Sequence, residues 1–154
     1  MRKNYMSYLL AMGFTLLAGT LAGLLSMAGM GYPSLQLPPL APPRWVFPIV
    51  WTVLYLLMGL GIAMVWNTGH SAARSSVRIY LIQLLVNLLW PFFFFRWELR
   101  GFAFFWLLLL LFLVVIMILR FDRISTPSAW LQIPYLLWLI FAAYLNFSIW
   151  LLNR

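Results

Sequence analysis

The sequence predicts an all-α integral membrane protein, folded as a single bundle of five transmembrane helices. The composition is 66% hydrophobic and only 8% charged, whereas a soluble domain carries about 25% charged residues. Five apolar stretches approach the ~20 residues that a helix needs to cross a ~30 Å hydrocarbon core. Basic residues stand at the edges of these stretches, where Lys and Arg anchor helices among lipid headgroups. Lipid must therefore be the solvent for most of the exterior.

The expected helices span residues 5–28, 45–66, 79–95, 102–119 and 130–152. The first follows a basic start, as a secretory signal does, but its apolar run exceeds the signal length of about 7–15 residues. We therefore expect it to be retained. The third is the shortest and contains Pro91, which predicts a kink or an early end.

The helices also differ in the surfaces that they offer. The fourth has no polar residue between Arg100 and Arg120, so we expect it to face lipid over much of its surface. In the first, Gly19 and Gly23 form a GxxxG spacing, which favours close packing inside the bundle and leaves a homodimer as the alternative. Ser128 is the candidate N-cap of the fifth.

The connection at 29–44 is unlike the short polar loops, because it reads GMGYPSLQLPPLAPPR. Its prolines bar a continuous helix, and its leucines are too apolar for a free linker. The pattern predicts a stiff lid loop that folds back over the bundle. An interfacial connector without function is the alternative.

The net charge of +8 is spread over helix ends, so the sequence argues against nucleic-acid binding. Loop charges favour a cytoplasmic N-terminus and an external lid loop. With this orientation the inner side carries Arg2, Lys3, Arg74, Arg78, Arg120 and Arg123, and the outer side carries Arg44, Arg96, Arg100 and Arg154.

Polar and aromatic residues within the spans point to a ligand. Gln83 and Asn87 stand four residues apart and so share a helix face. The deeper tryptophans are Trp51, Trp90 and Trp138. Flat aromatic rings with one or two amides suit a planar hydrophobic ligand. The alternative is that the amides only join helices and that the tryptophans are interfacial anchors.

Catalytic groups are scarce. The chain has no cysteine and a single histidine, His70, so a metal site is not expected. Glu98 and Asp122 fall on opposite predicted sides of the membrane, which excludes a carboxylate pair. No resident cofactor is predicted.

Three blocks of sequence resemble a known family. They read PPRWVFPIVWTVLYLLMG from Pro42, QLLVNLLWPFFFF from Gln83 and PYLLWLIFAAYLNFSIWLLN from Pro134. Together they are similar to the translocator protein family, also called tryptophan-rich sensory proteins or peripheral-type benzodiazepine receptors. The resemblance spans nearly the whole chain.

The resemblance implies a five-helix bundle that binds porphyrins such as protoporphyrin IX. It also implies binding of synthetic isoquinoline carboxamide and benzodiazepine-type ligands. Carried over position by position, the pocket residues are Trp51, Asn87 and Trp138, the lid contacts are Tyr32 and Pro42, and the walls are Phe47, Tyr55, Trp90, Ala142 and Leu145.

The chain departs from the family pattern in three places. Leu40 replaces a tryptophan two residues before the Pro-Pro pair, so we expect a weaker or different lid contact there. Pro48 stands one place earlier than the usual proline, so the kink is expected to be displaced. Arg154 lies too far beyond Tyr144 for the sterol motif of animal members, so sterol recognition is unsupported.

Three functions follow as hypotheses. The first is a binding or sensory protein for tetrapyrroles in a bacterial plasma membrane. The second is light- and oxygen-dependent breakdown of protoporphyrin with Trp51 and Trp138 as the reactive groups, so the sequence leans against an enzyme without excluding one. Facilitated transport ranks lowest, because no intramembrane carboxylate, nucleotide-binding loop or inverted repeat is evident.

Overall fold

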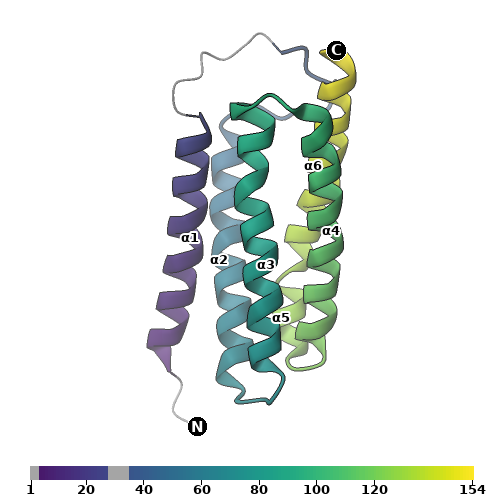
Figure 1. Ribbon diagram of the computed structural model, residues 1–154. Coiled ribbons are helices and arrows are strands. Elements are labelled where there is room, and N and C mark those ends of the chain that lie inside the picture. Colours follow the sequence, from purple (N-terminus) through teal and green to yellow (C-terminus); the bar gives the residue numbers. More distant parts are fainter. Residues whose placement is uncertain (1–3, 28–34) are drawn as a thin grey trace.

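The computed structural model describes residues 4–27 and 35–154, and every regular element within them is helical. Helices satisfy all their backbone groups internally, which lipid requires. Five spans are long and apolar enough to cross a membrane, which confirms the predicted all-α membrane fold. The elements are α1 (Tyr5–Met27), α2 (Val46–Asn67), α3 (Ala73–Pro91), η1 (Phe92–Arg96), α4 (Arg100–Asp122), α5 (Thr126–Trp130) and α6 (Ile133–Leu152) (Figure 1).

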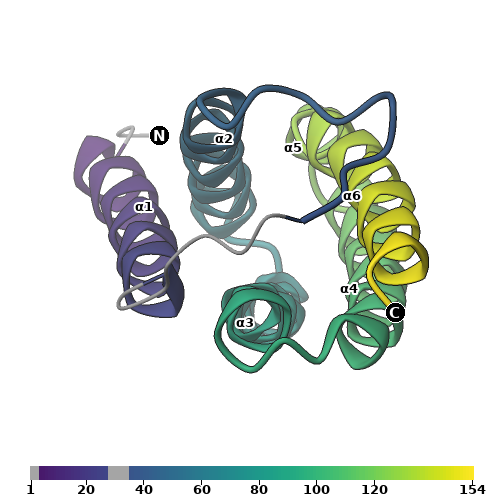
Figure 2. The same cartoon turned by 90° about the horizontal axis from the view of Figure 1, so that it is seen from above.

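The helices form two groups that α3 joins. Viewed from above, α1 lies at one edge of the bundle beside α2 and α3, and α4 and α6 lie together at the other edge (Figure 2). Helix α2 reaches that second group mainly through α5. We call the end of the bundle where α2 and α4 begin and α6 finishes the lid-side end (Figure 1).

The third span changes its helical geometry at Pro91. Because proline has no backbone N–H and its ring crowds the preceding turn, the α-helix ends there. The chain continues as a π-helical turn, η1, in which the N–H of Trp97 donates to the carbonyl of Phe92 at 2.9 Å. At its other end α3 begins at Ala73, ahead of the expected residue 79. The polar residues there extend the helix beyond its apolar stretch.

The fifth span is interrupted, which the sequence did not predict. Helix α5 ends at Trp130 and α6 starts at Ile133, because Pro134 cannot donate a hydrogen bond to the carbonyl of Trp130. The expected N-cap at Ser128 is wrong. Ser125 has the extended N-cap conformation, and Ser128 is buried within α5 with its Oγ donating to the carbonyl of Ser125 at 2.7 Å.

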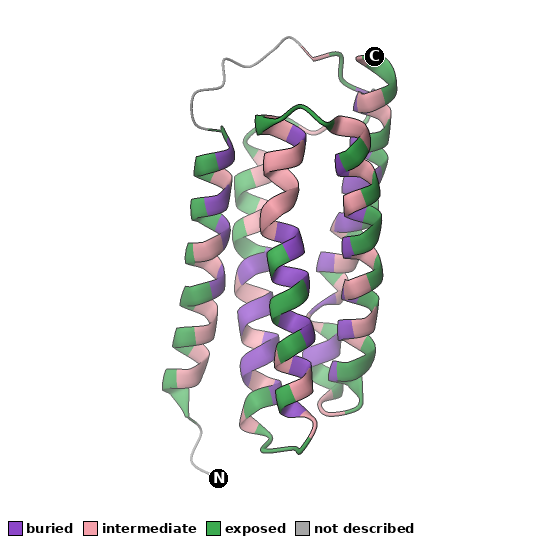
Figure 3. Ribbon diagram, in the orientation of Figure 1, coloured by how far each residue is buried: buried purple, intermediate pink, exposed green. Residues whose placement is uncertain are grey.

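Helix α4 buries one narrow stripe, although its sequence is apolar on every face. The buried residues recur at alternating spacings of four and three, as in a coiled-coil seam. They are Ala103, Leu107, Leu110, Val114, Met117 and Phe121. The outward surface of the same helix remains exposed, as expected for a span that faces lipid (Figure 3).

Small residues set the contact between α1 and α2. A Cβ at Gly19 would collide with the ring of Tyr55, and one at Gly59 would lie 2.5 Å from the Cα of Met12. Gly23 has nothing within 4 Å of the corresponding position. Gly19 therefore serves packing within the bundle, the interpretation that the spacing favoured.

Candidate ligand-binding site

A hydrogen-bonded network joins α2, α3 and α6 in the middle of the bundle. The hydroxyl of Tyr55 donates to Asn87 Oδ1 at 2.9 Å, and Asn87 Nδ2 donates to the hydroxyl of Tyr135 at 2.8 Å. That hydroxyl donates in turn to Gln83 Oε1 at 2.9 Å. Gln83 Nε2 points to Met58 Sδ at 3.7 Å. We call these five residues the polar layer.

The polar layer explains why α3 carries two amides on one face. Gln83 and Tyr135 are completely buried, and Asn87 is 3% exposed. An unpaired polar group at this depth would be strongly unfavourable, because hydrocarbon offers no replacement partner. Both ends of the Asn87 amide already bond to tyrosines, so this residue joins three helices through contacts within the chain.

Aromatic rings lie next to the polar layer, toward the lid-side end. The ring of Trp51 stacks on Tyr55 with centroids 5.4 Å apart and meets the edge of Tyr135 at 6.4 Å. The ring of Trp138 contacts Phe47 at 5.8 Å and Phe141 at 5.6 Å. Phe47, Trp51, Trp138 and Phe141, which we call the aromatic layer, are all half-buried. Two helices, α2 and α6, therefore contribute flat rings to one region.

The indole nitrogen of Trp138 stands out in this layer. Its Nε1 atom is buried and has no hydrogen-bond partner. The indoles of Trp90 and Trp106 differ, since their Nε1 atoms donate to Asn146 Oδ1 at 3.0 Å and to the carbonyl of Val86 at 2.8 Å. A buried indole N–H usually has a partner, so the lack of one at Trp138 calls for an explanation.

The remaining predicted site residues that the structure describes lie in three places. Trp90 lies beside the π-helical turn, where it stacks on Phe94 at 5.2 Å and bonds to Asn146. Ala142 and Leu145 are buried on α6, and Pro42 is half-buried in the lid loop. The predicted lid contact Tyr32 lies outside the described residues.

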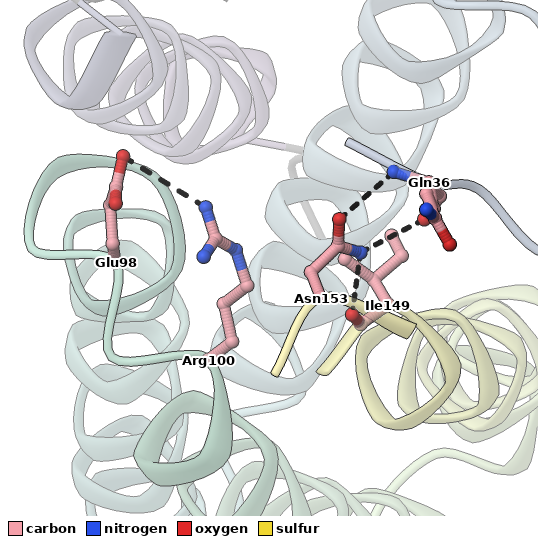
Figure 4. A network of polar contacts seen from close by, with 5 residues as sticks. All are labelled: Gln36, Glu98, Arg100, Ile149 and Asn153. Carbon is pink, nitrogen blue, oxygen red and sulfur yellow. Dashed lines mark hydrogen bonds and ion pairs between the residues drawn. The ribbon is translucent and has the colours of Figure 1, made fainter. Parts of the chain in front are cut away.

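The described part of the lid loop is attached to α6. The backbone N–H of Gln36 donates to Asn153 Oδ1 at 2.9 Å, and Asn153 Nδ2 donates to the carbonyl of Gln36 at 3.0 Å (Figure 4). Leu35 packs against a buried cluster that includes Phe94 and Ile149. Leu40 is 68% exposed, so the residue that replaces the family's tryptophan makes little contact with the bundle.

Neither Tyr135 nor Gln83 was among the predicted site residues, although Gln83 was expected to share a helix face with Asn87. Tyr135 proves to be the hub of the polar layer, since it accepts from Asn87 and donates to Gln83. Its position three residues before Trp138 was the available signal, because residues at that spacing share a helix face. Phe141 gave no comparable signal within an apolar helix.

Acid, base and metal-binding groups do not converge in the described part of the chain. No three His, Asp or Glu side chains there come together as a metal site would require. Glu98 precedes α4 and Asp122 ends it, and this helix of 23 residues separates them by about 34 Å. The site therefore offers aromatic stacking and a hydrogen-bond donor.

Comparisons with known proteins match nearly the whole chain to one family. The TspO/MBR family matches residues 11–151, which include the polar and aromatic layers. The chain is 36% identical to the tryptophan-rich protein TspO of Chlorobaculum tepidum, over 99% of both chains. It is 38% identical to the translocator protein of Ovis aries, over 94% of this chain and 90% of that protein. The protein CrtK of Rhodobacter capsulatus is 34% identical over 85% of this chain and 83% of its own length.

This chain belongs to the TspO/MBR family. The resemblance carried by the three sequence blocks is thereby confirmed. Family membership and five apolar spans together establish an integral membrane protein of the sensory and translocator class. In this TspO/MBR protein, the hydrogen bonds of the polar layer join three helices, and the aromatic layer holds the unpartnered indole nitrogen of Trp138.

Proposed function

We propose that this chain is a membrane receptor for a flat hydrophobic ligand, with protoporphyrin IX as the leading candidate. The observation that carries the proposal is the buried and unpartnered Nε1 of Trp138, set among aromatic rings from α2 and α6. An aromatic macrocycle would stack on these rings, and a carboxylate on its edge would accept the indole N–H. Membership of the TspO/MBR family supports the same class of ligand.

The synthetic ligand classes expected from the family fit the same groups. An isoquinoline carboxamide or a benzodiazepine combines fused aromatic rings with an amide carbonyl. In our proposal the rings pack against Phe47 and Trp51, and the carbonyl takes the place of the porphyrin carboxylate at Trp138. The loop charges add the proposal that the N-terminus is cytoplasmic and that the lid loop is external.

The test is a titration of purified protein in detergent with protoporphyrin IX, followed by tryptophan quenching in the dark. We expect saturable quenching for the natural chain and at least tenfold weaker binding for a Trp51→Ala and Trp138→Ala double variant. A Trp45→Ala and Trp130→Ala double variant is the matched control, because both side chains are more than 60% exposed at helix ends. Equal affinity in the two double variants would reject the proposed site.

Light-driven breakdown of the bound porphyrin is the second candidate. The observation that favours it is the stack of Trp51 on Tyr55, whose hydroxyl continues into the polar layer. Such a stack would offer an oxidisable aromatic group directly beside a photoexcited ligand. Illumination of the complex in oxygen should then yield a new absorbance spectrum, at a rate that falls in Trp51→Phe. An equal rate of porphyrin bleaching by this variant would reject breakdown through Trp51, and only the binding function would remain.

A further inference from the structure

A hollow of about 320 Å³ lies at the lid-side end of the bundle, apart from the aromatic layer. It opens where α4 begins and α6 ends, and its volume is at the lower end of the ~300–1,000 Å³ of small-molecule sites. Its lining residues are Glu98, Leu99, Arg100, Gly101, Phe102, Trp150, Asn153 and Arg154. Figure 4 shows Glu98 and Arg100 on one side of this region and Asn153, held by Gln36, on the other.

The guanidinium of Arg100 is the unusual group in this hollow. Its side chain is only 14% exposed, and its Nε is buried without a hydrogen-bond partner. Its Nη2 forms an ion pair with Glu98 Oε1 at 3.9 Å, which is too long for a hydrogen bond. A guanidinium has five N–H donors, and burying one of them without an acceptor is unfavourable. Arg100 therefore keeps donor capacity that an anionic group in the hollow could use.

The surroundings of Arg100 strengthen this requirement. Helix α4 starts at Arg100 without a side-chain cap, so the positive end of its dipole adds to the guanidinium charge. The guanidinium of Arg154 lies 5.3 Å from the centre of the Trp150 ring, in a cation–π contact. A Cβ at Gly101 would come within 2.7 Å of that ring, so glycine lets Trp150 pack against the start of α4. Arg100, Arg154 and the start of α4 therefore line the hollow together with Glu98.

We propose that this hollow binds the phosphate group of an anionic phospholipid, through Arg100, Arg154 and the start of α4. Its position selects lipid over a soluble anion. Helix α4 is apolar from Phe102 onward, so the hollow lies at the edge of the hydrocarbon core, where phospholipid headgroups are concentrated. Phe102 is 51% exposed and provides an apolar surface beside the arginines for the start of an acyl chain. The proposal is independent of the porphyrin site.

The experiment counts lipids bound to the purified protein by native mass spectrometry, while phosphatidylglycerol is titrated against phosphatidylcholine. We expect the natural chain to prefer phosphatidylglycerol, and an Arg100→Gln and Arg154→Gln double variant to bind it about tenfold more weakly. An Arg120→Gln and Arg123→Gln double variant removes the same charge at the opposite end, where both side chains are exposed, and should keep the preference. Circular dichroism verifies that all variants are folded.

Two further variants keep the test decisive. Arg154→Gln alone, in an exposed residue after the end of α6, should lower the affinity in a folded protein. Glu98→Gln removes the competing carboxylate and should raise the affinity about twofold or more, a direction that a purely structural role would not produce. Equal losses in the two double variants, or no preference in the natural chain, would overturn the proposal. Displacement of phosphatidylglycerol by millimolar inorganic phosphate would also overturn it, in favour of a soluble anion.

Discussion

The polar layer and the aromatic layer are adjacent regions built from the same helices, yet they differ in how their hydrogen bonds are used. In the polar layer, Tyr55, Asn87, Tyr135 and Gln83 exchange hydrogen bonds of 2.8–2.9 Å. In the aromatic layer, Trp138 has a buried donor without a partner. A satisfied network contributes cohesion between helices in lipid, whereas the unpartnered donor is the group that we propose to bind a ligand. Stability and binding should therefore respond to different substitutions.

The largest effect on stability is expected from Tyr135→Phe. The change removes one hydroxyl that bonds to both amides, so the buried atoms Asn87 Nδ2 and Gln83 Oε1 each lose a hydrogen-bond partner. We expect the free energy of unfolding to fall by about 1–3 kcal/mol. Thermal unfolding in detergent, followed by circular dichroism, measures this loss. Tyr144→Phe on the exposed face of α6 is the control and should change little.

A somewhat smaller loss of stability is expected from Gly19→Ala, because the new methyl group would collide with Tyr55 of the polar layer. The added methyl group meets the ring of Tyr55, which cannot move freely because it stacks on Trp51 and bonds to Asn87. Overpacking costs about 1–3 kcal/mol and alanine gains ~0.5–1 kcal/mol over glycine in a helix, so we expect a net loss of up to about 2.5 kcal/mol.

Gly23→Ala is the matched control for this change, because nothing lies within 4 Å of its Cβ position. It should be neutral or slightly stabilising in the same thermal unfolding measurement. If both variants lose stability equally, the close contact with Tyr55 does not explain why position 19 is a glycine.

The smallest effect is expected where the lid loop meets α6. Asn153→Ala removes two hydrogen bonds to Gln36 at a surface position, so the free energy of unfolding should fall by less than about 1 kcal/mol. Hydrogen exchange is the sharper measurement, because the Gln36 amide should lose its protection. The Ala41 amide, which donates to the carbonyl of Pro38 at 3.0 Å, provides the internal control. Unchanged exchange at Gln36 would show that another contact holds the loop.

The sequence predicted the features that depend on composition and on spacing along one helix. Apolar runs gave the five spans, and the four-residue spacing of Gln83 and Asn87 gave their shared face. The three family blocks gave the family. These signals are local, so they can be read before the helices are placed relative to one another.

Features that depend on pairing between helices could not be predicted. Helix α4 is apolar on all sides, so no contrast between polar and apolar residues marks its buried stripe from Ala103 to Phe121 in the sequence. Nothing in the sequence distinguishes Trp138 from Trp90, although only Trp90 has a partner for its indole nitrogen, in Asn146. The roles of such residues follow from which neighbour the fold supplies.

The most direct test of the central claim is the affinity of Trp138→Phe for protoporphyrin IX. The change keeps an aromatic ring and removes only the unpartnered donor, so we expect about tenfold weaker binding with unchanged thermal stability. Trp106→Phe, which removes a donor already bonded to Val86, should lose stability and keep its affinity. A Trp138→Phe protein that binds protoporphyrin as tightly as the natural chain would contradict the account.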